Sequence, residues 1–332
     1  MPRLRVVSTV LVTDSGWPSH EVETEVLAPL GAQVVRAPGR DEETLLRHVA
    51  GADALLVGTA KIGPALLDAA PRLRIVARYG IGLDNVEVEE ATRRGVVVTN
   101  APGFCREEVA EHVLALLLCL ARGVHLYDRA VRAGDWTRAG ARSVRRVSGQ
   151  TLGVVGFGAI GRTVAERAAG IGMRVIAHDP VVADEAIRAA GADPVSLADL
   201  ARRADVVTLH TPLTDETRGL VSEAFLAAMK PTAFLINTAR GALVDQDALT
   251  AALSEGRIAG AGLDTFVPEP LPPGHPLLET ERALLTPHVA FYSEESVHDV
   301  RVRAARSVAA ALAGERPAET VNPAVFEHAR WR

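Results

Sequence analysis

The 332-residue sequence has few cysteines, no long apolar run and no excess of basic residues. Its two cysteines, Cys105 and Cys119, form neither a disulfide framework nor a metal-ligand spacing, which favours a reduced, cytoplasmic protein without a metal site. The longest apolar stretch, Val113 to Ala121, is about half as long as a transmembrane helix. The apolar segment Leu4–Val12 is short and no cleavage site follows it, so we expect no signal peptide. A formal net charge of −5 without a basic tail gives no reason to expect nucleic acid or a membrane as a partner.

The pattern of apolar residues indicates two α/β units. A hydrophobic content of 48% over this length is enough for about two domains. Short apolar runs alternate with helical patterns up to residue 100, which is typical of a parallel sheet covered by helices. A long helical pattern follows over Arg106–Ala121, with an extension to Arg132 as the alternative, and the polar residues 134–149 are predicted to form a loop. A second α/β unit begins at Thr151.

The expected elements of both units can be given by residue range. The predicted strands are residues 3–13, 33–36, 54–59, 74–79, 96–100, 152–155, 174–177, 206–210, 233–238, 258–263 and 283–286. The predicted helices outside the central one are residues 21–30, 42–50, 64–70, 85–94 and 293–313. Residues 268–276 contain five prolines and are predicted to form an extended surface loop.

One stretch near the middle of the chain carries a nucleotide-binding pattern. The apolar run Leu152–Val155 is followed at once by Gly156-x-Gly158-x-x-Gly161, then by a helical pattern and a second apolar run that ends at Asp179. The first glycine permits a tight turn, the second lets the backbone approach a pyrophosphate, and the third lets the helix pack closely on the strand. Asp179, about 20 residues further on, can accept hydrogen bonds from a ribose and would repel a 2′-phosphate. We therefore predict NAD binding; the alternative is a glycine-tightened turn without a ligand.

The position of this pattern defines the expected domains. A complete α/β unit precedes it, and the last predicted helix follows the second unit. We therefore expect a discontinuous substrate domain of residues 1–101 plus 294–332 and an NAD-binding domain of residues 102–293. The expected fold class is α/β, with two Rossmann-like doubly wound parallel sheets: a flavodoxin-like substrate domain and an NAD-binding domain joined at a hinged cleft.

Three polar residues follow predicted strands of the second unit and are candidates for catalysis. Arg240 can bind a carboxylate through its fork of N–H groups. His288 is a histidine, a residue type suited to acid/base catalysis, and a carboxylate such as Glu269 can orient the imidazole. Ligands bind at the carboxyl ends of parallel strands, so the three side chains could meet there. Each also has a structural explanation: Arg240 could cap a turn or pair with Asp245, Glu269 could be a solvated loop charge, and His288 a turn histidine.

Several stretches with distinctive sequences run through the chain in a fixed order. They are Ala77–Asn85, Gly153–Gly161, His210-Thr-Pro-Leu, Asn237–Asp245, Gly262–Pro270 and Thr286–Ala290. Together they resemble the D-isomer-specific 2-hydroxyacid dehydrogenase family. Within it, Pro102–Glu111 and Phe291–Ser296 look most like the bacterial branch related to the C-terminal-binding-protein corepressors, although those proteins carry Trp in the segment where Phe291 stands.

The resemblance implies roles for individual residues. Arg240 would bind and orient the substrate, His288 would be the acid/base, and Glu269 its partner. The backbone N–H groups of Ile81 and Gly82 would bind the substrate carboxylate. The other expected cofactor contacts, beside the three glycines and Asp179, are Ala159 and Ile160 at the pyrophosphate, Thr211 and Pro212 at the adenosine, Thr238 and Asp264 at the nicotinamide, and His210, Thr217 and Ala290.

Two further expectations concern an anion and a partner. Lys61, in the loop after the third predicted strand, is a candidate anion contact, and a solvated surface lysine is the alternative. The resemblance also implies a homodimer that forms through residues of about 104–146.

The sequence therefore predicts an NAD-dependent oxidoreductase. Hydride would pass between the nicotinamide and a small anionic 2-hydroxy or 2-oxo acid, with His288 as acid/base. Two alternatives remain open at this point: an NADH-sensing, corepressor-like binding protein, and a member of the same family that acts on a phosphonate or phosphite. The sequence does not identify the acid.

Overall fold

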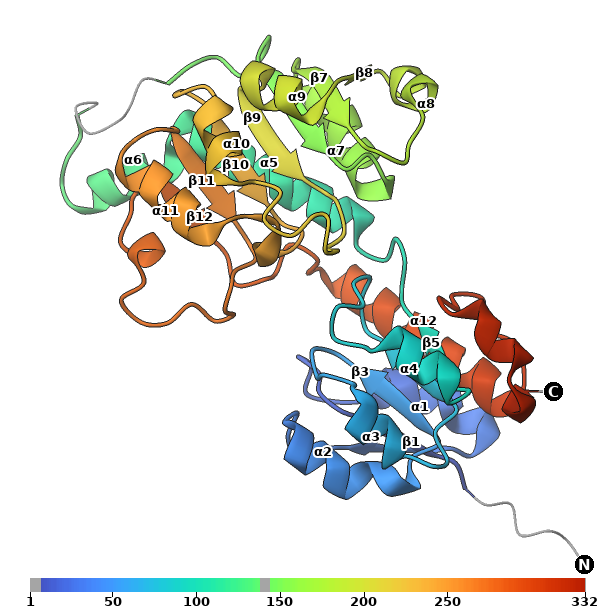
Figure 1. Cartoon of the computed structure of the whole chain (residues 1–332). Coiled ribbons are helices and arrows are strands. Elements are labelled where there is room, and N and C mark those ends of the chain that lie inside the picture. The colour runs from blue at the N-terminus through green and yellow to red at the C-terminus, as the bar shows by residue number, and fades with distance from the viewer. Residues whose placement is uncertain (1–6, 138–143, 332) are drawn as a thin grey trace, which may run out of the picture. The chain divides into compact units, whose positions relative to one another are not determined.

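The computed structural model describes residues 7–137 and 144–331, and the chain divides into two compact units (Figure 1). Unit 1 consists of Met1–Phe104 and Ser293–Arg332, and unit 2 of Cys105–Tyr292. Each unit is built on a parallel sheet, so the predicted α/β class with two parallel-sheet domains is confirmed. The assignment of unit 1 to the substrate remains a proposal.

Unit 1 is a flavodoxin-like sheet with helices on its faces. Over the described residues its five strands have the order β2-β1-β3-β4-β5, and all pairs are parallel. Its elements are β1 (Thr9–Val12), α1 (Glu21–Leu27), η1 (Ala28–Leu30), β2 (Gln33–Arg36), α2 (Glu42–His48), η2 (Val49–Gly51), β3 (Ala54–Val57), α3 (Pro64–Asp68), β4 (Ile75–Arg78), α4 (Val88–Arg93), β5 (Val97–Thr99), α12 (Glu294–Ala313), η5 (Pro323–Glu327) and η6 (Ala329–Trp331).

The C-terminal helix α12 completes the core of unit 1. The apolar residues Val300, Ala304 and Val308 recur at helical spacing and are buried against β1, β3, β4 and α1. Ser293 caps the N-terminus of α12 in a capping box, and Gly314 ends the helix with a φ of 84°. In Figure 1 this red helix lies among the blue elements of unit 1.

Unit 2 has the strand order of a dinucleotide-binding sheet. Over the described residues its seven parallel strands are ordered β12-β11-β10-β9-β6-β7-β8, so the order reverses between β6 and β9. Its elements are α5 (Arg106–Arg122), α6 (Val124–Arg132), β6 (Thr151–Val155), α7 (Ala159–Gly170), β7 (Arg174–His178), α8 (Asp184–Ala189), β8 (Asp193–Pro194), α9 (Leu197–Arg203), β9 (Val206–Leu209), α10 (Glu223–Ala228), β10 (Phe234–Asn237), η3 (Gly241–Leu243), α11 (Gln246–Ser254), β11 (Gly260–Leu263), η4 (Pro276–Leu278) and β12 (Ala283–Leu285).

The central helical pattern forms two helices. Gly123 takes a left-handed conformation with a φ of 65°, which ends α5 and starts α6 at an angle of 61°. The helical pattern therefore does extend to Arg132, as the alternative held, but it is broken at Gly123 into two helices. No single helix in the described part of the chain is long and apolar enough to cross a membrane; α5 and α6 pass that test only as a bent pair, and one face of α5 is buried inside unit 2.

Some predicted boundaries differ from the structure. The first strand was expected over residues 3–13, of which 3–6 lie outside the described residues, and β1 spans Thr9–Val12. The short edge strand β8 was missed because its sequence, Asp-Pro, has no apolar run. Of the predicted loop 134–149, residues 138–143 lie outside the described residues, and the flanking residues form neither helix nor strand.

Candidate functional site

The three glycines after β6 differ in the space that a Cβ would have at each position. Gly156 has a φ of 89°, and a Cβ there would lie 2.6 Å from the carbonyl carbon of His210. A Cβ on Gly161 would collide with the carbonyl oxygen of Gly156, so the close approach of α7 to β6 requires glycine. Gly158 precedes the first turn of α7, and a Cβ there would meet no atom of the described chain within 4 Å. The turn is therefore sterically closed at Gly156 and Gly161 and open at Gly158.

Ala159 and Ile160 are the first residues of α7, so their N–H groups belong to the uncapped N-terminus of a 12-residue helix. The helix has no side-chain cap hydrogen bond at its N-cap residue, Gly158. Its dipole and its free N–H groups favour an anion at this end. This end of α7 also lies at the point where the strand order of the sheet reverses, which is where ligands of such sheets bind.

Asp179, at the end of β7, is held as a carboxylate beside this turn. Its Oδ2 accepts the N–H of Phe157 at 2.7 Å, and its Oδ1 accepts the N–H groups of Val181 and Val182 at 2.8 and 3.0 Å. Burial raises the pKa of Asp179, but these three hydrogen bonds outweigh it and the pKa lies below the ordinary value. A fixed negative charge therefore lies next to the glycine turn.

The loop after β9 borders the same turn. The N–H of His210 donates to Val155, and burial lowers the pKa of His210 to about 3, so the ring is neutral at physiological pH. Thr211 and Pro212 follow it, half-buried and exposed respectively. The hydroxyl of Thr217 donates to the carbonyl of Pro212 at 2.7 Å and so holds this loop in a compact turn.

The turn after β10 presents Arg240. The Asn237 side chain accepts the N–H of Ala239 at 3.1 Å and donates to the carbonyl of Arg240 at 2.8 Å, which fixes the backbone of the turn. The Arg240 guanidinium donates to the carbonyl of Ala239 at 2.7 Å. Thr238 is buried, and in the described part of the chain its hydroxyl has no hydrogen-bond partner. A buried hydroxyl without a partner is costly, and a bound polar group would satisfy it.

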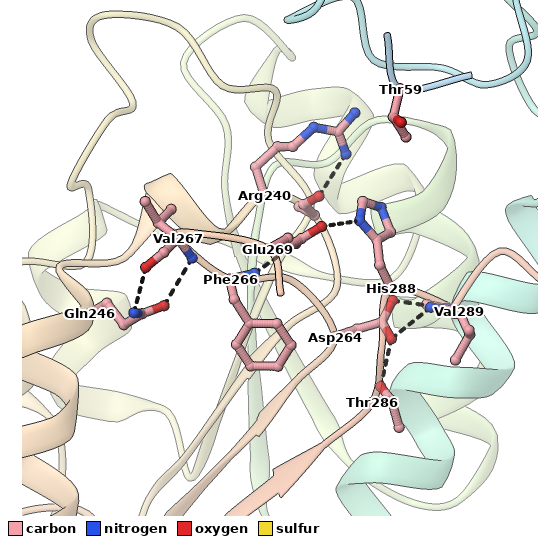
Figure 2. Close-up of polar contacts among 12 residues, drawn as sticks. Thr59, Arg240, Gln246, Asp264, Phe266, Val267, Glu269, Thr286, His288 and Val289 are labelled. Carbon is pink, nitrogen blue, oxygen red and sulfur yellow. Dashed lines mark hydrogen bonds and ion pairs between the residues drawn. The ribbon is translucent and has the colours of Figure 1, made fainter. Parts of the chain in front are cut away.

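Glu269 and His288 form a hydrogen-bonded pair, and Figure 2 shows the two side chains facing each other. Glu269 Oε2 lies 2.8 Å from His288 Nδ1, while Glu269 Oε1 accepts the N–H of Phe266 at 2.7 Å. The side chains are 36% and 40% exposed, respectively. Burial raises the pKa of Glu269, but the hydrogen bonds from His288 and Phe266 and the charges of His288 and Arg240 bring it below the ordinary value.

Two backbone contacts position the loop that carries Glu269. Gln246, at the start of α11, donates to the carbonyl of Val267 at 2.7 Å and accepts its N–H at 3.0 Å. The backbone of Gly241 lies so close to that of Phe266 that a Cβ on Gly241 would collide with it. The turn after β10 and the loop after β11 are thus packed together, which explains how Arg240 influences Glu269.

His288 occupies a left-handed backbone conformation, with a φ of 56°, which is uncommon for a residue other than glycine. Asp264, at the end of β11, holds this turn: its carboxylate accepts the N–H of Val289 at 2.9 Å and of Ala290 at 2.8 Å. The Thr286 hydroxyl donates to Asp264 Oδ1 at 2.5 Å. Asp264 is completely buried, so these contacts compensate its desolvation and stabilise the strained turn.

In unit 1, Ile81 and Gly82 follow β4. Their backbone N–H groups have no acceptor in the described part of the chain, while the carbonyl of Ile81 accepts the Asn100 side chain at 2.7 Å. Two adjacent N–H groups at the carboxyl end of a parallel strand are suited to a carboxylate. Lys61, in the loop after β3, is exposed.

A second set of N–H groups in unit 1 is already satisfied by the chain itself. The Asp14 carboxylate accepts the consecutive N–H groups of Gly58, Thr59 and Ala60 at 3.1, 2.6 and 3.2 Å. Asn85 donates to the carbonyls of Gly58 and Ala60, so the loop that leads to Lys61 is held from two sides. These three N–H groups therefore already have an acceptor, unlike those of Ile81 and Gly82 in the described part of the chain.

Within unit 2, two of the three predicted catalytic side chains, Glu269 and His288, thus form a direct hydrogen bond. The charge of the third, Arg240, contributes to lowering the pKa of Glu269. Sequence reasoning did not identify Asp14, Thr286 or His112, which lies 3.0 Å from the Thr286 hydroxyl. The sequence gives one indication for His112. It lies four residues before Leu116 in the predicted helix, so both residues lie on the same helix face.

Comparison with known proteins agrees with this geometry. The model of the family "D-isomer specific 2-hydroxyacid dehydrogenase, NAD binding domain" matches residues 114–290. A glyoxylate reductase of Korarchaeum cryptofilum is 44% identical over 290 residues, which cover 86% of this chain and 87% of that protein. A D-3-phosphoglycerate dehydrogenase of Mycobacterium tuberculosis is 43% identical over 94% of this chain, which spans 58% of that protein.

A solved structure gives the same result for the fold. The D-lactate dehydrogenase of Aquifex aeolicus, in complex with NAD and lactic acid, has a TM-score of 0.85 and 28% identity over 95% of this chain and 99% of that one. The corepressor-related branch remains a prediction, because these relatives do not single it out. The glycine turn, the reversed strand order and these matches lead to one conclusion: this chain belongs to the D-isomer specific 2-hydroxyacid dehydrogenase family, and it is an NAD-dependent oxidoreductase.

Proposed function

We propose that this enzyme transfers hydride between NAD and a small anionic 2-hydroxy or 2-oxo acid, with His288 as the acid/base. The observation that carries the proposal is the hydrogen bond between Glu269 Oε2 and His288 Nδ1 at 2.8 Å. It leaves Nε2 as the ring nitrogen without a partner in the described part of the chain. A histidine that is oriented in this way by an ionised carboxylate is suited to proton transfer near neutral pH.

NADH, when bound, supplies the hydride. In the reductive direction the chain provides the proton: His288 in its protonated form donates from Nε2 to the carbonyl oxygen of the oxo acid, while Nδ1–H stays hydrogen-bonded to Glu269. The negative charge of Glu269 stabilises the imidazolium before the transfer. In the oxidative direction the neutral His288 removes the hydroxyl proton through the same nitrogen.

Arg240 and unit 1 are proposed to bind the substrate. The Arg240 guanidinium can polarise the carbonyl and bind a carboxylate oxygen through its fork of donors. The N–H groups of Ile81 and Gly82 are proposed to bind the carboxylate, since they have no acceptor within the described chain. Lys61 is a further candidate contact for a second anionic group, because it follows the loop that Asp14 fixes.

The cofactor contacts are proposed from the open side of the glycine turn. Gly158, Ala159 and Ile160 would hold the pyrophosphate, and Asp179 the adenosine ribose. The remaining predicted contacts are the loop residues His210, Thr211, Pro212 and Thr217 and, at the nicotinamide, Thr238 with its unpaired hydroxyl, Asp264 and Ala290. Because Asp264 already accepts three hydrogen bonds from the chain, we expect it to act mainly through the turn that it holds.

The test is a substrate panel with the purified full chain. NADH oxidation is followed with glyoxylate, pyruvate, hydroxypyruvate and 3-phosphohydroxypyruvate, and NAD reduction with phosphite. We expect steady turnover with at least one 2-oxo acid and none with phosphite. The absence of turnover with every 2-oxo acid at saturating concentration would refute the proposed substrate class, and turnover with phosphite alone would replace it.

We also propose that the chain forms a homodimer through residues of about 104–146 and acts in the cytoplasm. None of the residues of α6 is buried, and Val124, Val131 and Trp136 are 55%, 43% and 82% exposed. Apolar side chains that recur on one exposed segment favour a protein partner, and a second copy provides the same apolar surface. Neither cysteine forms a disulfide in the described part of the chain, which agrees with a reducing compartment.

A further inference from the structure

His112 lies on α5, outside the pair that carries out proton transfer, and it contacts the residues that hold this pair in place. Its Nε2 lies 3.0 Å from the Thr286 hydroxyl and 3.8 Å from Asp264 Oδ1. The side chain is 22% exposed, so it is largely enclosed in unit 2. The helix α5 is packed tightly here: a Cβ on Gly262, in β11, would lie 3.1 Å from the Cβ of Leu116, one turn after His112.

The direction of each hydrogen bond follows from the available protons. Thr286 has one hydroxyl proton, and Asp264 as a carboxylate can only accept, so Thr286 must donate to Asp264 at 2.5 Å. The Thr286 oxygen can then only accept from His112, so His112 Nε2 must carry a proton. The chain of hydrogen bonds therefore runs in one direction, from His112 through Thr286 to Asp264.

The end of this chain supports the catalytic turn. Besides Thr286, Asp264 accepts the N–H groups of Val289 and Ala290, which directly follow His288. The left-handed conformation of His288 is unfavourable for a residue with a side chain, and it persists only where the surroundings hold it. If Thr286 lost its donor from His112, its hydroxyl could rotate away from Asp264 and weaken the anchor of the turn.

We propose that His112 is a positioning residue for the reaction, because its Nε2–H orients Thr286 and thereby fixes Asp264 and the turn that carries His288. This inference rests on the proposed role of His288 as acid/base. His112 does not touch the reacting groups; it sets the direction of a hydrogen-bond chain whose other end controls where the imidazole lies. Small displacements of a catalytic group are enough to lower turnover strongly.

The experiment compares His112→Leu, which removes the donor, with His112→Gln, whose Nε2 lies close to the position of the histidine Nε2. For His112→Leu we expect kcat with the best oxo acid to fall by about tenfold, with KM and the NADH dissociation constant within about twofold. His112→Gln should recover most of the lost kcat. The matched control is His298→Leu, the same change at an exposed position on α12, which should leave kcat unchanged.

Two further results decide the inference. Thr286→Val should lower kcat to a similar extent, and the double variant His112→Leu/Thr286→Val should be no worse than either single variant, because both break the same chain. Losses that multiply, or a His112→Leu variant with normal kcat, would overturn the inference. A fall in kcat that His112→Gln does not relieve, accompanied by a lower melting temperature in both variants, would also overturn it in favour of simple packing.

Failure of this inference can be told apart from failure of the proposed function. If His288→Asn loses turnover while His112→Leu keeps it, only the positioning role of His112 is wrong. If His288→Asn turns over normally, the proposed function itself is wrong, whatever the result at His112.

Discussion

Replacing Glu269 with glutamine tests how the carboxylate assists His288. The substitution keeps the size of the side chain and the acceptor for the Phe266 N–H, but it removes the negative charge 2.8 Å from His288 Nδ1. A hydrogen bond to a charged group contributes about 1.5–3 kcal/mol. Because the two side chains are 36% and 40% exposed, solvent screens the charge, and we take the lower end, about 1.5 kcal/mol.

This energy can be converted into a shift of the pH profile. About 1.4 kcal/mol corresponds to one pH unit in a protonation equilibrium. Reduction requires protonated His288, and the carboxylate favours that form, so its loss moves the alkaline limit of activity to lower pH. In Glu269→Gln, the pH at which the reductive rate falls to half should therefore decrease by about one unit, and turnover at any pH above the wild-type alkaline limit should fall by about tenfold.

The assay is the rate of NADH oxidation at saturating oxo acid from pH 5 to pH 9, for wild type, Glu269→Gln and the control Glu279→Gln. Glu279 is an exposed residue of the same loop region, at the end of η4. The control should reproduce the wild-type profile. An unchanged profile in Glu269→Gln would show that the carboxylate does not stabilise the imidazolium.

Three other predictions follow from the structure. Asp179→Ala should lower the preference for NADH over NADPH in kcat/KM by about tenfold or more, because it removes the carboxylate that would repel a 2′-phosphate; an unchanged preference would contradict this role. Asp14→Asn should lower the melting temperature at pH 7, since an amide cannot accept all three loop N–H groups. Burial raises the pKa of Asp14, but its hydrogen bonds hold it below 3.8, so its contribution to stability is present above about pH 4 and is lost as the pH falls further. The melting temperatures of wild type and Asp14→Asn should therefore converge in acid. A constant difference in melting temperature down to pH 3 would argue against this. Val131→Arg should convert a dimer into a monomer in sedimentation velocity, and a wild-type monomer would disprove the proposed dimer.

The nucleotide-binding turn could be predicted from the sequence because its requirements are local. Gly156, Gly158 and Gly161 are fixed by backbone sterics between neighbouring elements, and their spacing alone reveals these requirements. The alternation of strands and helices was equally informative, because parallel strands buried on both faces are continuous apolar runs. These features make up most of the fold.

The arrangement of the candidate site could not be derived in the same way. Glu269 and His288 are 19 residues apart, and their spacing does not show that the loop after β11 brings their side chains together. The left-handed turn at His288 and its anchor, Asp264, depend on backbone N–H groups, which every residue but proline has and which leave no trace in a sequence. The sequence shows His112 only as part of an apolar helix face. That Gly123 ends α5 and begins a second helix is visible only in the structure.

The most direct test of the account is the turnover of His288→Asn, with the oxo acid that wild type reduces fastest, measured beside its affinity for NADH. Asparagine tolerates the left-handed conformation of residue 288 and cannot donate a proton near neutral pH. We expect kcat to fall by about 10²- to 10⁴-fold, while NADH binding, measured by fluorescence titration, changes by no more than about twofold. A variant that binds NADH and reduces the oxo acid at a rate close to that of wild type would show that His288 is not the acid/base.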